Sequence, residues 1–183
     1  MDDSKQDSSS VGELARELEN IGEGAFRRKH PYPFLVEVYQ PEDDFEDDEN
    51  AQTGEVPVID FSQEVSKWMI MKAIAVAGSG GDASNTRVTV GRLKSNDIVL
   101  RGSKISKQHA GFYRDKEQWQ LMDLGSMNGT AVNGNQLKEN QKAGLKSKDV
   151  ISFWRYTFEF HQTDSFIEFL FKVVLRKNYR RRK

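Results

Sequence analysis

Residues 88–134, VTVGRLKSNDIVLRGSKISKQHAGFYRDKEQWQLMDLGSMNGTAVNG, decide the fold of this chain. Short runs in which apolar and polar residues alternate are separated here by segments rich in Gly, Asn and Ser, a pattern typical of β-strands joined by turns. The predicted strands in and around this stretch are 68–77, 87–91, 98–100, 110–114, 118–123, 131–132 and 149–160. So many short strands at close spacing predict an all-β sandwich.

The alternation along these strands also predicts the core. Side chains of one parity point to the same face of a strand, and the interior is expected to hold Trp119, Leu121, Phe153, Phe158 and Phe160. Trp154 and Tyr156 are assigned to the opposite parity, so we expect them to face outward or to pack beneath terminal helices.

Three polar clusters lie at or just after the ends of predicted strands, at 91–92, 106–109 and 126–130. Loops at strand ends commonly carry binding residues. The side chains that these loops present are the guanidinium of Arg92, the hydroxyl of Ser106, the ammonium groups of Lys104 and Lys107, and the amide of Asn128. Such donors suit a phosphate ester on a peptide, with the amide left to hold the peptide backbone.

The chain shows no pattern of a catalyst or of a cofactor site. It has no Cys, and its three His, at positions 30, 109 and 161, are scattered. No disulfide, no metal centre and no nucleophile paired with a base is therefore predicted, and we expect a binding module that uses no cofactor. His30 has no catalytic partner near it in the sequence and is expected on the surface.

The order of the motifs resembles that of the forkhead-associated (FHA) domain. The resemblance covers about residues 68–162 and rests on Gly91-Arg92, Asn96-Asp97-Ile98, Ser106-x-x-His109-Ala110, Asp123-Leu124-Gly125-Ser126, Asn128-Gly129-Thr130 and Val132-Asn133-Gly134. It implies a β-sandwich that reads phosphothreonine.

The resemblance also implies a role for each loop residue. Arg92 would contact the phosphate, Ser106 would hydrogen-bond a phosphate oxygen, and Lys107 would add a second contact. Asn128 would hold the main chain of the peptide, and Lys104 would contact the peptide beside it.

Four further positions follow from the resemblance. His109 would tie the loops together behind the site, with Gly91 and Gly129 as structural support. Position 127 is commonly Ser or Thr in phosphothreonine readers, but here it is Met127. Because a hydroxyl donor is missing, a lower affinity is expected without a change in ligand class.

The chain divides into three predicted parts. Residues 1–66 form an extension with a helix at about 10–22, which the capping-box pair Ser10 and Glu13 begins, and an acidic linker at 41–55. Residues 30–39 read as an extended, Pro-started strand or docking segment, and the prolines suit a sheet edge. Residues 67–162 form the domain, and 163–183 form a helix, begun by Ser165 and Glu168, with a basic tail. The two helices are expected to pack together as a lid on one end of the sandwich.

Charge differs sharply between these parts. Residues 1–66 hold 5 Lys and Arg against 18 Asp and Glu, a net charge of −13, whereas residues 67–183 hold 22 against 10, a net charge of +12. A basic domain suits a reader of anions, and the acidic leader beside it will interact with it electrostatically. No secretory signal and no apolar run long enough to span a bilayer is visible, so a cytoplasmic protein without a membrane role is expected.

The expected partners are a Thr-phosphorylated protein and the Ser/Thr kinase that modifies it. Thr53, after the acidic run, is a candidate phosphosite, because some bacterial proteins of similar layout bind their own phosphorylated leader. The alternative hypothesis is a phosphate-independent interaction domain that docks through its terminal helices. Binding of nucleic acid by the basic tail, residues 176–183, is the least favoured reading, since the tail interleaves only Tyr179 and no nucleic-acid fold is recognised.

Overall fold

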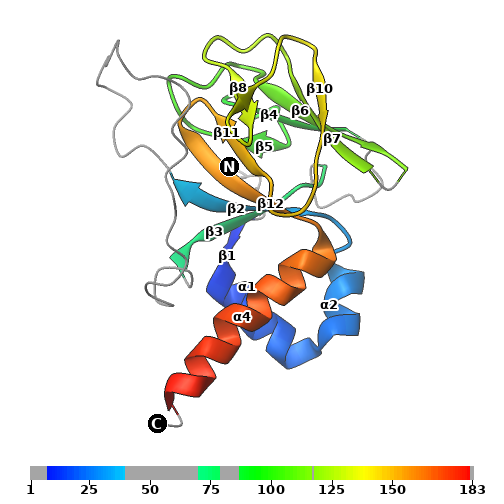
Figure 1. Ribbon diagram of the computed structural model, residues 1–183, viewed down its shortest axis with the longest axis vertical. Coiled ribbons are helices and arrows are strands. Elements are labelled where there is room, and N and C mark those ends of the chain that lie inside the picture. Colours follow the sequence, from blue (N-terminus) through cyan, green and yellow to red (C-terminus); the bar gives the residue numbers. More distant parts are fainter. Residues whose placement is uncertain (1–7, 40–69, 79–86, 117, 182–183) are drawn as a thin grey trace.

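Two sheets, in which all but one of the strand pairs described are antiparallel, face each other in this chain (Figure 1). The computed structural model describes residues 8–39, 70–78, 87–116 and 118–181. The seven-stranded sheet has the order β1-β3-β2-β12-β11-β8-β9, and its strands are β1 Ser8–Ser10, β2 Phe34–Tyr39, β3 Lys72–Ala75, β8 Thr130–Val132, β9 Asn135–Gln136, β11 Val150–Phe153 and β12 Tyr156–His161. The five-stranded sheet has the order β10-β7-β6-β4-β5, with β4 Arg87–Gly91, β5 Ile98–Val99, β6 Ala110–Asp115, β7 Gln118–Asp123 and β10 Lys142–Gly144. Only β4 and β5 pair in parallel among the described strands.

The predicted β-sandwich is confirmed, and most strand predictions match to within a residue. The strands β4 and β7 have the predicted bounds. The predicted strand 68–77 is shorter, since only Lys72–Ala75 pairs as β3 among its described residues. The strands β9 and β10 were not predicted, because two or three largely exposed residues carry no readable alternation.

The core between the sheets contains the five residues predicted for it. Trp119 and Leu121 face inward from β7, and Phe153, Phe158 and Phe160 do so from the opposite sheet. The prediction for Tyr156 was wrong, because Tyr156 is only 6% exposed and belongs to this core. Residues 149–160 were read as one strand, whereas the chain turns between β11 and β12, so the inward parity begins again at Tyr156.

The leader contributes an internal strand to the sandwich. Strand β2 lies between β3 and β12 and pairs with both, so the predicted edge position was wrong. Its two prolines lie at 31 and 33, before the strand begins at Phe34, and therefore remove no donor from the ladder. The short strand β1 pairs with β3 at the edge instead.

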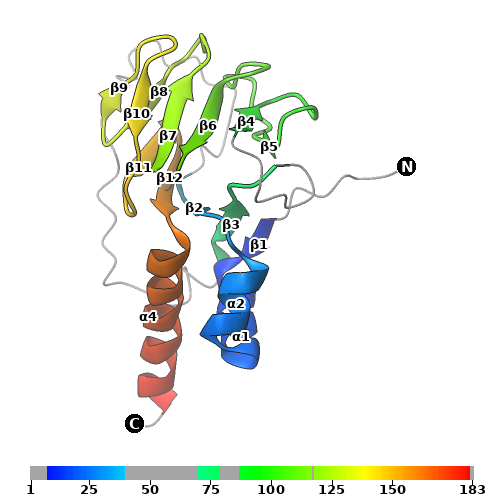
Figure 2. The ribbon, with the colours of Figure 1, turned by 90° about the vertical axis from the view of Figure 1, so that its right-hand side faces the viewer.

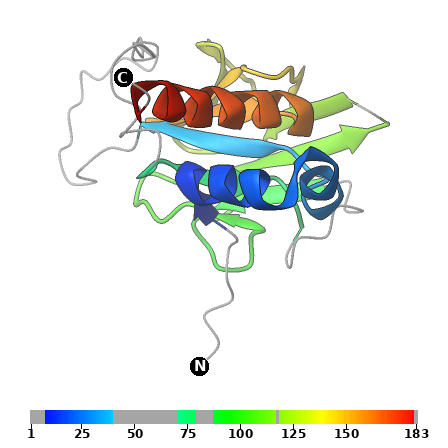
Figure 3. The ribbon, with the colours of Figure 1, turned by 90° about the horizontal axis from the view of Figure 1, so that it is seen from below.

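Three helices cover one end of the seven-stranded sheet: α1 Val11–Ile21, α2 Glu23–Lys29 and α4 Thr163–Arg181. Helix α1 begins with the predicted capping box, in which Glu13 N donates to Ser10 Oγ (3.2 Å) and Ser10 N donates to Glu13 Oε2 (2.8 Å). Seen from below, α1 and α4 run side by side with β2 between them (Figure 3). The predicted packing of these two helices is confirmed.

A second apolar cluster fills the space between the helices and the sheet. Phe166 of α4 stacks on Phe34 of β2, with ring centroids 4.1 Å apart, and Leu14 and Leu18 of α1 complete the contact. Figure 2 shows the helices at the end of the molecule away from the loops that connect β4 to β5 and β7 to β8. This leaves those loops accessible.

Two expectations about this end were wrong. Helix α4 begins at Thr163, so Ser165 lies inside its first turn, where its Oγ is 3.2 Å from Nδ1 of His161. His30 is only 8% exposed, with Nε2 3.2 Å from Glu17 Oε2 and Nδ1 3.1 Å from the Tyr32 hydroxyl. The unpredicted helix α2 ends at Lys29, and the ring of its C-cap residue His30 lies against Phe26, which explains the burial.

None of the helices in the described ranges is both long enough and apolar enough to cross a bilayer.

Candidate functional site

Three loops meet at the end of the sandwich opposite the helices: 92–97 between β4 and β5, 100–109 between β5 and β6, and 124–129 between β7 and β8. Arg92 N donates to the carbonyl of Ser106 (3.0 Å), which joins the first loop to the second. Met127 N donates to Ser106 Oγ (3.0 Å), which joins the third loop to the second. Both Arg92 and Met127 therefore contact Ser106, although they lie 35 positions apart in the sequence.

The first junction depends on Gly91. A Cβ atom at this position would lie 2.4 Å from the carbonyl oxygen of Lys107, so a side chain here would force the loops apart. The buried amide of Asn96 adds a second link, because its Nδ2 donates to the carbonyls of Leu93 (2.9 Å) and Lys107 (2.8 Å). Sequence reasoning used Asn96 only as a motif residue and missed this bracing role.

The second junction positions Asn128. Its side-chain Nδ2 donates to the carbonyl of Lys104 (2.7 Å), so its Oδ1 is the atom left to accept a hydrogen bond from a ligand. Ser106 Oγ already accepts from Met127 N, and its own proton can therefore be donated outward. The structure thus brings Arg92, Ser106 and Asn128 to one rim.

His109 lies behind this rim, fully buried. Its Nδ1 accepts a hydrogen bond from Ser106 N (3.1 Å), so the ring proton is on Nε2, which donates to the carbonyl of Gly129 (3.1 Å). Burial lowers the pKa of His109 below its ordinary value, although the Gly129 carbonyl and Asp123 act in the opposite direction. The neutral ring ties the second loop to the third.

Asp123, at the end of β7, organises the third loop. Its Oδ1 accepts from the N–H groups of Gly125 (2.9 Å) and Ser126 (2.8 Å), and its Oδ2 accepts from the hydroxyls of Ser126 and Thr130 (2.6 Å each). Burial alone would raise the pKa of Asp123, but these hydrogen bonds together lower it. Sequence reasoning did not assign this role, although an Asp at a strand end with Gly-Ser starting two residues later is a recognisable turn signal.

Gly129 closes the third loop in a left-handed conformation, with φ at +83°, which favours glycine. Its carbonyl accepts from His109 Nε2 and from Trp154 N (3.0 Å), so the turn between β11 and β12 borders the site. Met127, next to Asn128, has a side chain that is 89% exposed. It makes no contribution to the core and lies open to a ligand.

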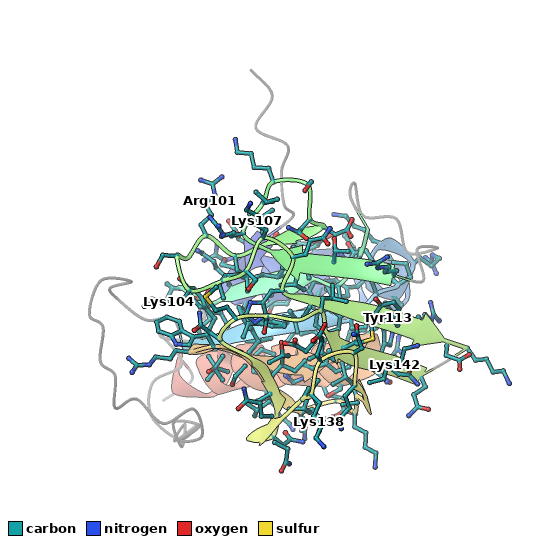
Figure 4. All side chains as sticks on the ribbon, turned by 90° about the horizontal axis from the view of Figure 1, so that it is seen from above. Arg101, Lys104, Lys107, Tyr113, Lys138 and Lys142 are labelled. Carbon is teal, nitrogen blue, oxygen red and sulfur yellow. The ribbon has the colours of Figure 1, made fainter. Side chains whose placement is uncertain are left out.

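The rim is rich in cations. Arg92 and Lys107 are exposed, and Figure 4, which looks onto the loops, shows Arg101, Lys104 and Lys107 on the same side of the molecule. Sequence reasoning did not single out Arg101. Tyr113, Lys138 and Lys142 lie on the other side of this view.

The chemistry of the described rim is that of an anion-binding surface. Guanidinium, ammonium, hydroxyl and amide groups all donate hydrogen bonds. Among the residues for which the structure gives positions, no group of three His, Asp or Glu could hold a metal ion. Fold and rim together give a β-sandwich whose loops at one end present several hydrogen-bond donors on one surface.

Residues 88–154 match the family model of the FHA domain, and this part of the chain is assigned to that domain. The match spans all three loops and both glycines that support them.

Similarity to known proteins is concentrated in the same region. An oxoglutarate dehydrogenase inhibitor of Corynebacterium jeikeium is 36% identical over 70 residues, which are 38% of this chain and 49% of that protein. An FHA domain-containing protein of Arabidopsis thaliana is 37% identical over 71 residues, 38% of this chain and 18% of that protein. The solution structure of an FHA domain from an Arabidopsis thaliana hypothetical protein has a TM-score of 0.42 and 31% identity, covering 49% of this chain and 73% of that one. The chain thus spans about half the length, or less, of these two curated relatives.

The buried pair of His109 and Asp123 predicts a pH dependence of stability. The folded-state pKa of each group is lowered, so the unfolded chain binds more protons on acidification. The contribution of His109 to the free energy of unfolding is complete above the pKa of about 6.5 that it has in the unfolded chain. This contribution is lost as the pH falls through the folded-state pKa. We expect the free energy of unfolding, measured by urea denaturation, to fall between about pH 7.5 and about pH 5.

The variant His109→Gln is the control for this prediction, because an amide does not titrate in this range while His30 and His161 remain. Its unfolding free energy should be lower at neutral pH and should fall less on acidification than that of the wild type. An equal fall in both proteins would contradict the assignment to His109.

Proposed function

We propose that this protein is a non-catalytic module that binds phosphothreonine-containing segments of partner proteins. The observation that carries the proposal is the shared use of Ser106, whose carbonyl accepts from Arg92 N and whose hydroxyl accepts from Met127 N. This brings a guanidinium, a hydroxyl and the amide of Asn128 to one rim. The partner would be the product of a Ser/Thr kinase, and the protein would act as a regulator or adaptor in that signalling pathway.

Each group on the rim has a role in this proposal. Arg92 meets the phosphate with its planar fork of donors, and no carboxylate among the described residues pairs with it. Ser106 donates its proton to a phosphate oxygen, and Lys107 adds a second charge. Asn128 accepts from the peptide backbone through Oδ1, and Lys104 borders the peptide beside it. The match to the FHA domain supports these proposed roles.

The alternative, docking through the terminal helices without phosphate, finds less support. The apolar residues of α1 and of the first part of α4 pack against each other and against β2. In α1 the only large apolar side chain that is exposed is Ile21. Little apolar surface is left on α1 and the first part of α4 for a partner.

The variant Arg92→Ala should abolish phosphopeptide binding without loss of the fold. A bidentate, charge-assisted contact contributes several kcal/mol, which corresponds to a loss of at least about 100-fold in affinity. Calorimetric titration with one peptide, with and without phosphate on its threonine, measures the effect. Arg28→Ala, on exposed α2 at the opposite end, is the matched control and should bind as the wild type does. Equal affinities of wild type and Arg92→Ala would refute the role of Arg92.

The variant Met127→Thr should bind phosphothreonine peptides more tightly. It restores a hydroxyl beside Ser106 and Asn128, at a side chain that contributes nothing to the core. One neutral hydrogen bond is worth about 1 kcal/mol, or roughly fivefold in affinity. The same titration serves as the test, with Met127→Val as the control for shape. If Met127→Thr bound no tighter than Met127→Val, no hydroxyl would reach the phosphate from this position.

We also propose that the leader, once phosphorylated at Thr53, is a ligand for the site in its own chain. Thr53 and the acidic linker lie outside the described residues, so this proposal rests on the sequence and on the fixed ends of the segment. Thr53 is 14 residues from the end of β2 at Tyr39, a reach of up to about 48 Å in an extended chain. Tethering on this scale gives effective concentrations in the millimolar range.

Binding of a partner peptide should therefore weaken when Thr53 is phosphorylated. The comparison is between protein phosphorylated at Thr53, unphosphorylated protein, and the variant Thr53→Val treated with the same kinase. Unchanged affinity for a phosphothreonine peptide after modification of Thr53 would eliminate the self-binding proposal and leave the site itself untouched.

A further inference from the structure

We infer that the site selects phosphothreonine in an acidic context, so that the ligand carries Asp or Glu beside the modified residue. This inference rests on the proposed function and adds a ligand class to it. The evidence is the charge of the rim, which exceeds what one phosphate group requires.

The first two loops hold five cations within sixteen residues: Arg92, Lys94, Arg101, Lys104 and Lys107. The third loop adds none, but the neighbouring turn adds Arg155, whose guanidinium lies 5.3 Å from the centre of the Trp154 ring. That turn adjoins the site, because Trp154 N donates to the carbonyl of Gly129. Cations therefore border the rim on more than one side.

The three carboxylates described near these loops, Asp97, Asp123 and Glu139, are fewer than the six cations. Asp97 faces inward to Thr89, whose N–H and hydroxyl both donate to its Oδ2 (2.8 and 2.9 Å). Asp123 is 3% exposed and is held by its four hydrogen bonds. Glu139 lies against Gly125, beside the third loop, and is the remaining acid next to these loops among the described residues.

A phosphate group needs only part of this set. The roles proposed above use Arg92 and Lys107 for the phosphate, whereas Lys94 and Arg101 are exposed and have no role in them. Like charges held close together repel one another, and an anionic ligand relieves that repulsion. A peptide with carboxylates on either side of the phosphothreonine supplies the complementary charge. The reaction that generates such a ligand is phosphoryl transfer to a threonine within an acidic segment.

The test uses three phosphothreonine peptides of equal length whose flanking residues are Glu, Gln or Lys. We expect the Glu peptide to bind about tenfold more tightly than the Gln peptide at low salt, and the Lys peptide to bind most weakly. The difference should shrink at about 1 M salt, where the screening length falls to about 3 Å. Fluorescence anisotropy of labelled peptides gives the dissociation constants, and the unphosphorylated Glu peptide should bind at least 100-fold more weakly than its phosphorylated form.

The variants Lys94→Gln and Arg101→Gln locate the effect. Each should weaken binding of the Glu peptide by about threefold, the scale of one exposed ion pair, and leave binding of the Gln peptide unchanged. Arg28→Gln, at the helical end, should change neither. An equal loss for both peptides would mean that the variant acts on phosphate binding or on the fold, and would overturn the assignment.

The outcomes separate this inference from the function on which it rests. Equal affinities of the Glu and Gln peptides, with phosphate still required, would overturn the acidic preference and leave the phosphothreonine module intact. Absence of a phosphate requirement in all three peptides would overturn the proposed function itself.

Discussion

Asp123 accepts four hydrogen bonds at the end of β7, and the third loop of the rim takes its shape from them. Once the loop is closed, the Gly129 carbonyl meets His109 Nε2, and His109 Nδ1 in turn accepts from Ser106 N. A buried carboxylate is costly unless hydrogen bonds satisfy its lone pairs. The loop conformation that brings these four donors to Asp123 is therefore favoured over others. The positions of Ser106 and Asn128 depend on it.

The sandwich beneath the loops includes a strand from the leader. Strand β2 comes from the leader, lies between β3 and β12, and buries residues on both of its faces, Leu35 in the main core and Phe34 and Val36 in the second. The helices then cover the outer side of the same strands. The helical end of the molecule is thus filled with packed apolar side chains, and the opposite end carries the polar groups of the three loops.

Charge is distributed along the chain in a way that bears on both ends. Residues 67–183, the domain and its C-terminal tail, are basic and the leader is acidic, with net charges of +12 and −13. Two ion pairs at the helical end lie outside this contrast: Glu17 and Lys29 both belong to the leader, and Arg27 of the leader pairs with Asp164 of the basic part. The first two loops of the rim carry Arg92, Lys94, Arg101, Lys104 and Lys107, so positive charge is concentrated at that end of the molecule.

Strand alternation and motif order were sufficient to predict the sandwich, its aromatic core, the helix that begins at the Ser10 cap, and the loops that carry Arg92, Ser106 and Asn128. These features are local, because each is written in the spacing of neighbouring residues. The internal place of β2, the burial of His30 and Tyr156, and the bracing by Asn96 and Asp123 required the tertiary structure. Each of these features depends either on a contact between segments that the fold brings together or on the point where the chain turns. The spacing of residues along one strand does not say which other segment of the chain that strand will contact.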